Sequence, residues 1–210
     1  MDNMEKLLVN IDPKVLADIK AYVAAEMGGS RKDGAKFRGR FDIDVFDNKE
    51  SMNLISHSSC HNIITDEGLN RILDVMLGGN GSNNTQTTTW YCSIFESNST
   101  PAAGWTYDLY ADSQCTEWQQ YDETTRPAYV EATSSGKSVT NSANKAVFTA
   151  NTGAKTLYGA ALLSVNTKGD HAAGSNNRLF CAGTFAVAQP VIAANVVNLT
   201  YTVTAADDGV

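Results

Sequence analysis

The chain has 210 residues, of which 42% are hydrophobic and 19% are charged, and its formal net charge is −7. A chain of this length can bury one sizeable core, and an acidic chain without a basic stripe is not typical of a general nucleic-acid binder. Because the chain has no run of about 18 apolar residues, it is expected to have no membrane-spanning helix. The N-terminus lacks the pattern of a secretory signal, so the four scattered cysteines are expected to be free thiols in a protein made in the cytoplasm.

The first predicted element is an amphipathic helix over residues 13–27. Asp12 can cap this helix, Pro13 suits its first turn, and two glycines end it. A short helix is marginally stable alone, so its apolar stripe must be buried, either on the chain's own domain or on a neighbouring subunit. The stripe residues are the candidate partner-binding residues of this arm: Leu16, Ile19, Val23 and Met27.

A strand is predicted next, because FRGRFDIDVFD alternates strictly between apolar and charged residues. The charged face carries Arg38, Arg40, Asp42 and Asp44, which we expect to neutralise one another. A turn and a second strand from Leu54 to Ile64 follow. A helix over residues 66–77 is then predicted from apolar side chains at helical spacing.

From residue 80 onward the pattern is one of short strands separated by turns rich in Gly, Asn and Ser. No regular alternation with helices is present, so a parallel sheet is not expected. The pattern predicts a mainly β fold, a β-sandwich of the jelly-roll or immunoglobulin-like kind, with an N-terminal helical arm and one short internal helix. We expect an arm and linker over residues 1–35 and a sandwich domain over residues 36–210.

The histidines are the best candidates for a catalytic or metal site in this sequence, but their spacing does not fit such a site. His57 and His61 would share a face of a strand about 13 Å apart, too far to hold one metal ion, while Cys60 would point away. No nucleophile elbow, phosphate-binding glycine loop or zinc-protease helix occurs. We therefore expect no catalytic residues, no cofactor and no metal site.

An aromatic-rich stretch between residues 98 and 127 is weakly patterned, as binding loops often are. Its aromatic side chains could form a surface-recognition loop for a sugar or a protein, with Trp105, Tyr110 and Trp118 as the candidates. More often such side chains fold back and cover the open end of a sandwich, and we favour that interpretation.

Several segments together resemble a family of virion structural proteins of tailed bacteriophages, over about residues 36–206. The resemblance is carried by KFRGRFDIDVFD, HNIITDEGLNRILDVML, TTTWYCSIFESNSTPAAGWTY, TEWQQYDETTRPAYVEA, NSANKAVFTANTGAKTLYGAALLSV and VVNLTYTVTAA. None of these segments is a catalytic motif. The resemblance implies a β-sandwich building block on the phage head, as a decoration or cement protein, or in the tail.

We therefore expect a non-enzymatic capsid decoration protein on the outer surface of the head, bound to the major capsid protein. A homo-oligomer is expected, because sandwich edges must be covered and closed symmetry is one way to cover them. The family resemblance and capsid geometry favour a trimer. Neither nucleic acid nor a membrane is expected as a partner. The alternative is a tail or head-fibre component with a receptor- or carbohydrate-binding sandwich.

Overall fold

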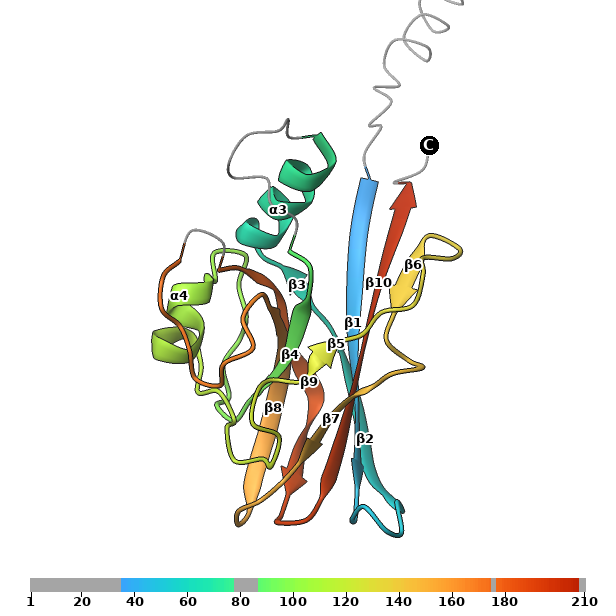
Figure 1. Cartoon of the computed structure of the whole chain (residues 1–210), viewed down its shortest axis with the longest axis vertical. Coiled ribbons are helices and arrows are strands. Elements are labelled where there is room, and N and C mark those ends of the chain that lie inside the picture. The colour runs from blue at the N-terminus through green and yellow to red at the C-terminus, as the bar shows by residue number, and fades with distance from the viewer. Residues whose placement is uncertain (1–34, 78–86, 175–176, 208–210) are drawn as a thin grey trace, which may run out of the picture. The chain divides into compact units, whose positions relative to one another are not determined.

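A computed structural model describes residues 35–77, 87–174 and 177–207 (Figure 1). The chain divides into two compact units, Phe37–Ala206 and a second unit that contains both termini. The predicted N-terminal helix, with its stripe residues Leu16, Ile19, Val23 and Met27, lies outside the described residues. The predicted boundary between an arm and a sandwich domain stays a prediction.

Two antiparallel sheets of five strands each form the larger unit, so the predicted mainly β class is correct. Sheet A has the order β2-β1-β10-β6, with β7 also paired to β10, and sheet B has the order β3-β9-β8-β4-β5. The strands of sheet A are β1 (Ala35–Phe46), β2 (Leu54–His61), β6 (Ser138–Thr140), β7 (Ala146–Thr149) and β10 (Val196–Asp207). The strands of sheet B are β3 (Ile63–Ile64), β4 (Trp90–Phe95), β5 (Ala128–Tyr129), β8 (Lys155–Leu163) and β9 (Leu179–Val191).

The main core lies between the two sheets. On β1 the predicted alternation is confirmed, because Phe41, Ile43 and Val45 are fully buried. Sheet B contributes Ile94 and Leu157 to the same cluster. Full burial of each such side chain contributes about 1.5–3 kcal/mol to folding before entropy is counted, so this interior is the main source of stability.

The strand predicted from Leu54 to Ile64 is wrong in one respect, because the chain changes sheets at Asn62. Residues up to His61 belong to β2 in sheet A, whereas β3 pairs with β9 in sheet B. The Asn62 backbone N–H still donates to the Gly39 carbonyl on β1, at 3.1 Å. Its side-chain Nδ2 donates to the Tyr201 hydroxyl, at 3.3 Å. Asn62 is therefore a corner residue that joins the edges of the two sheets.

A bulge in β9 overturns a second detail. Regular alternation along β9 would place Val187 on the same face as the buried residues Leu179, Cys181 and Phe185, but Val187 is 64% exposed. Residues 185–188 of β9 lie opposite Tyr158 alone on β8, so the alternation of faces is lost along this part of the strand.

Both sides of the pair of sheets are covered by the chain itself. On one side β2 lies beside β9, and the Val187 N–H donates to the Ser58 hydroxyl at 3.0 Å. On the other side the segment after Tyr121 follows β7, where the Asp122 N–H donates to the Thr149 carbonyl at 2.8 Å. These contacts occupy part of the edge of β2 and part of the edge of β7.

The predicted internal helix is present as α3 (Asp66–Leu77). Thr65 caps it, since its hydroxyl accepts a hydrogen bond from the Gly68 N–H at 3.1 Å. The Glu67 carboxylate accepts from the Leu179 N–H at 2.8 Å and from the Tyr107 N–H at 3.0 Å, so the first turn of α3 is fixed to β9 and to the aromatic segment.

Candidate functional site

The three candidate recognition residues of the aromatic segment are buried, so they do not form a surface loop. Trp105 is 8% exposed, Tyr110 is fully buried and Trp118 is 1% exposed. We favoured the interpretation that these side chains fold back and cover the open end of the sandwich. They do fold back and are buried, but Trp105 and Tyr110 cover the outer face of sheet B, which carries apolar side chains on both faces, and Trp118 lies in the main core.

That cover is a second, smaller core on the outer face of sheet B. The short helix α4 (Tyr107–Leu109) and the π-helix η1 (Tyr110–Gln114) place their tyrosines over β4 and β8. The ring of Trp105 packs between Phe95 and Tyr110, with centroid separations of 6.1 and 6.4 Å. Trp118 instead enters the main core, 5.3 Å from Tyr121 and 6.0 Å from Phe148. The aromatic segment thus supplies both cores.

A buried ion pair holds this segment in place. Glu117 and Arg126 form two hydrogen bonds of 2.7 Å, and neither side chain is more than 1% exposed. Further partners surround both groups. Ser93 Oγ and the Gly169 N–H donate to the Glu117 carboxylate, and the Arg126 guanidinium donates to the Val165 and Asp170 carbonyls.

The pKa shifts and the burial of this network are those of an ion pair that stabilises the fold. Burial alone would lower the pKa of Arg126, but the hydrogen bonds and the charge of Glu117 outweigh it and raise that pKa. Burial raises the pKa of Tyr110 well above its ordinary value, and its hydroxyl donates to Ser93 Oγ at 3.0 Å. A charged carboxylate whose acceptor sites are engaged and that does not reach solvent is poorly placed to act on a substrate.

Sequence reasoning missed this ion pair. Glu117 and Arg126 are nine residues apart in an irregular segment, so neither helical nor strand spacing relates them. Both residues lie in the segment TEWQQYDETTRPAYVEA, but no local signal in that segment shows that the two charges meet inside the protein.

The charged outer face of sheet A follows the predicted neutralisation only in part. Arg40 pairs with Asp42 at 2.6 Å, as expected. Asp44 instead pairs with His57 Nδ1 at 2.7 Å and with Lys145 Nζ at 2.8 Å. The partners of Asp44 come from β2 and from the residue before β7, which sheet pairing brings to β1.

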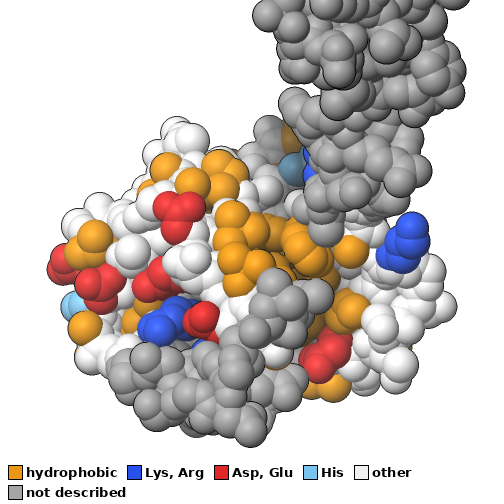
Figure 2. Space-filling model, turned by 90° about the horizontal axis from the view of Figure 1, so that it is seen from above, with side chains coloured by type: hydrophobic (Ala, Val, Ile, Leu, Met, Phe, Trp, Pro, Cys, Tyr) orange, Lys and Arg blue, Asp and Glu red, His pale blue; other side chains and the backbone are white. Residues whose placement is uncertain are grey.

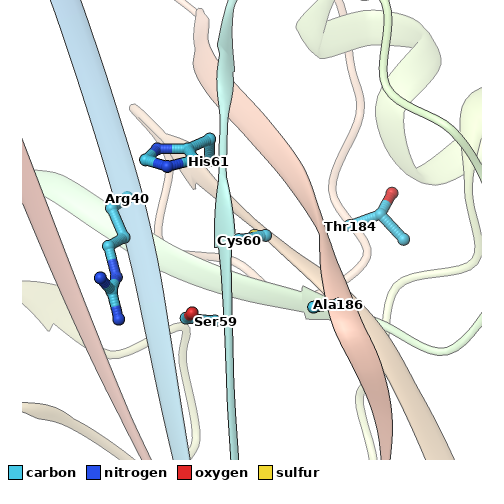
Figure 3. A pocket seen from close by; sticks show the side chains of 6 residues that line it. All are labelled: Arg40, Ser59, Cys60, His61, Thr184 and Ala186. Atoms are coloured by element: carbon cyan, nitrogen blue, oxygen red, sulfur yellow. The ribbon is translucent and has the colours of Figure 1, made fainter.

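A hollow of about 380 Å³ lies where β1, β2 and β9 approach one another (Figure 3). Its polar lining includes Arg40, Ser59 and His61, and Arg40 is already engaged by Asp42. Burial raises the pKa of the Cys60 thiol to about 12, so this cysteine is a poor nucleophile. The hollow therefore brings polar groups together beside a thiol that is not activated.

The state of the cysteines, the arrangement of possible metal ligands and the character of the helices follow from the described part of the chain. All four cysteines are free, as predicted. Within residues 35–77, 87–174 and 177–207, no group of three or more His, Cys, Asp or Glu side chains is arranged to hold a metal ion. Each helix of the described part is too short or too polar to be a transmembrane segment.

The large hydrophobic side chains that are exposed in the described part are aliphatic residues and a methionine. On α3, two of the apolar side chains whose spacing predicted the helix, Leu69 and Leu73, are 43% and 54% exposed, whereas Gly68 and Arg71 are buried. Figure 2 shows apolar side chains gathered over this end of the unit. A second group lies at the opposite end, where the β1–β2 and β9–β10 turns meet.

Comparison of the chain with protein-family models, with curated proteins and with solved structures finds no match.

Proposed function

We propose that this chain is a non-enzymatic virion structural protein of a tailed bacteriophage, and that it decorates and stabilises the head by binding the major capsid protein. We further propose that its two sheets form a sandwich of the jelly-roll or immunoglobulin-like kind. One observation carries the proposal: the aromatic side chains of the best candidate binding loop are buried, while the large hydrophobic side chains exposed in the described part are aliphatic or methionine. Such a surface suits contact with another protein better than a pocket for a small ligand.

The acidic balance supports a place on the outer surface of the particle, since an inward position would put the chain beside nucleic-acid phosphates. We keep a homo-oligomer, with a trimer favoured, as part of the proposal. An oligomer interface would cover the strand edges that remain open beside the two intrachain contacts, Val187 with Ser58 and Asp122 with Thr149.

The alternative, a tail or head-fibre component that binds a receptor or carbohydrate, loses its candidate residues. Trp105, Tyr110 and Trp118 cannot contact a glycan while they are buried. Sugar binding would have to use other groups, such as the polar hollow of about 390 Å³ beside Glu96, Lys155 and Tyr158.

The test is binding of the purified full chain to phage heads that lack it. Saturable binding supports the proposal, and no binding to heads together with binding to tails or to host glycans supports the alternative. A chain without residues 1–30 tests the arm with its Leu16/Ile19/Val23/Met27 stripe. Weaker binding at an unchanged melting temperature supports docking on a neighbour, and unchanged binding with a much lower melting temperature places the stripe in the chain's own core.

A further inference from the structure

A polar hollow of about 390 Å³ lies where the end of β4 and the start of β8 meet residue 116 of the aromatic segment. Its volume falls within the range of about 300–1,000 Å³ that is usual for small-molecule sites. Six of its lining residues carry a hydroxyl, a carboxylate or an ammonium group: Glu96, Ser97, Thr116, Lys155, Thr156 and Tyr158. The hollow is therefore a candidate site for a small polar ligand.

Hydrogen bonds fix the wall of the hollow that the end of β4 and the aromatic segment form. The Glu96 N–H donates to the Thr116 carbonyl at 2.8 Å, and the Thr116 N–H donates to Ser97 Oγ at 2.8 Å. Ser97 Oγ in turn lies 2.9 Å from Ser99 Oγ. A wall that is already ordered loses less conformational entropy when a ligand binds, so it favours binding.

An irregularity in sheet B places an aromatic ring at the hollow. Leu157 and Gly159 of β8 are paired with β9, whereas residues 185–188 of β9 lie opposite Tyr158 alone. Bulges of this kind turn a side chain out of the regular alternation, and they are frequent next to active sites. The Tyr158 side chain packs against the second core and also lines the hollow, so its position is fixed.

The two charges in the hollow balance each other. Lys155 Nζ lies 3.1 Å from Glu96 Oε1 and 3.0 Å from Oε2. Within the described residues, no donor forms a hydrogen bond of good geometry with the buried Oε2 atom, and a further donor there would stabilise it. An ammonium group has three donors, of which Glu96 Oε1 takes one. The pair thus keeps hydrogen-bonding capacity for a neutral ligand but offers no net charge to an ion.

We infer that this hollow binds one residue of a neutral saccharide. Each sugar hydroxyl both donates and accepts, which matches the Glu96 carboxylate, the Lys155 ammonium and the threonine hydroxyls of the lining. Tyr158 supplies apolar contact area for the carbon face of a sugar ring, next to a phenolic hydroxyl. A charged ligand would instead have to compete with one partner of the ion pair. The inference does not rest on the proposed function, because all of these groups belong to a single chain.

The hollow beside β1, β2 and β9 does not share these features. Its described lining residues include no Phe, Tyr or Trp and no carboxylate. Arg40, which lines it, is engaged by Asp42. That hollow offers neither an aromatic ring nor an acidic acceptor to a sugar, so its residues serve as controls.

The experiment titrates the full chain with glucose, galactose, mannose and N-acetylglucosamine and follows the backbone amide signals by NMR. We expect saturable shifts at Lys155 and Tyr158 with at least one of these neutral sugars. Lys155→Met and Thr156→Val should each weaken that binding by about fivefold or more, the value of one net hydrogen bond. The matched controls are Lys145→Met, an ion-paired lysine that is 36% exposed, and Ser59→Ala in the other hollow. Both controls should stay within about twofold of the wild type.

Absence of saturable shifts with all four sugars overturns the inference. It is also overturned if Lys145→Met or Ser59→Ala loses as much affinity as its counterpart in the proposed site. All four variants replace partly exposed side chains, and melting temperatures close to that of the wild type show that lost binding is not lost folding.

Glucosamine and glucuronate are titrated alongside as a cationic and an anionic sugar. Tighter binding of either one than of every neutral sugar overturns the assignment to a neutral ligand. The outcome is separate from that of the head-binding test. A chain that binds phage heads but no sugar loses this inference alone, and a chain that binds a neutral sugar but no heads loses the proposed function alone.

Discussion

Glu117 and Arg126 meet inside the protein through two parallel hydrogen bonds of 2.7 Å, although the two residues belong to an irregular segment. The pair links that segment to β4 through Ser93 and to the loop after β8 through Gly169 and Val165. It thereby holds the cover of the second core in position. The consequences of breaking this pair can be measured.

Replacement of Arg126 with Met should lower the free energy of unfolding by about 3–5 kcal/mol, because it leaves a buried carboxylate without its countercharge. Adding Glu117→Gln should restore part of the loss, since it removes the buried charge and its single amide oxygen can still accept from the Gly169 N–H. Urea unfolding of the single and double variants measures both effects.

The surface pair of Lys155 and Glu96 is the control for this experiment. These side chains are 34% and 16% exposed and lie 3.0 Å apart. Lys155→Met should cost no more than about 1 kcal/mol, as exposed pairs do. Equal losses for Lys155→Met and Arg126→Met would contradict a special role for the buried pair.

Replacement of Trp118 with Ala should destabilise the fold by about 3–5 kcal/mol, because it opens a cavity in the main core. The effect should appear in thermal unfolding, whatever ligand is tested.

Iodide should quench the fluorescence of Trp105 and Trp118 weakly in the folded protein. Strong quenching that a glycan relieves would show that these rings are accessible and would revive the recognition loop.

Gly159→Ala should destabilise the protein by at least about 1–3 kcal/mol, as overpacking does. A Cβ atom at position 159 would lie 2.1 Å from Phe95 Cζ and 2.3 Å from the Gly183 carbonyl oxygen. Gly104→Ala is the matched control, because nothing lies within 4 Å of a Cβ atom there. Similar melting temperatures for the two variants would show that β4, β8 and β9 do not approach as described.

The carboxyl group of Asp44 should titrate below its ordinary pKa of 3.8. Burial raises this pKa, but the hydrogen bonds and charges of Lys145 and His57 outweigh it and lower it. The folded form is thus stabilised above pH 3.8, and that contribution is lost as the pH falls through the folded pKa. Carboxyl NMR titration checks the midpoint, and Lys145→Ala should move it upward; an unchanged midpoint would separate Asp44 from Lys145.

Local chemistry was enough to predict several elements from the sequence. The alternation that ends in Val45 places β1 against the core, and Thr65 begins α3 with a backbone hydrogen bond three residues away. Both signals depend on neighbours within one strand or one helical turn, so they are legible without knowledge of the fold. The mainly β class follows from the same kind of local pattern.

Tertiary structure alone decided which distant residues meet. Lys145 reaches Asp44 across 101 positions of sequence, and the Leu179 N–H reaches Glu67 across 112. The sheet change at Asn62 and the bulge around Val187 likewise depend on the path of a neighbouring strand. Periodicity along one segment carries no information about that path, because a contact between distant residues depends on how the whole chain packs. For the same reason the sequence could not assign Trp105 and Tyr110 to a cover on the outer face of sheet B and Trp118 to the core between the two sheets.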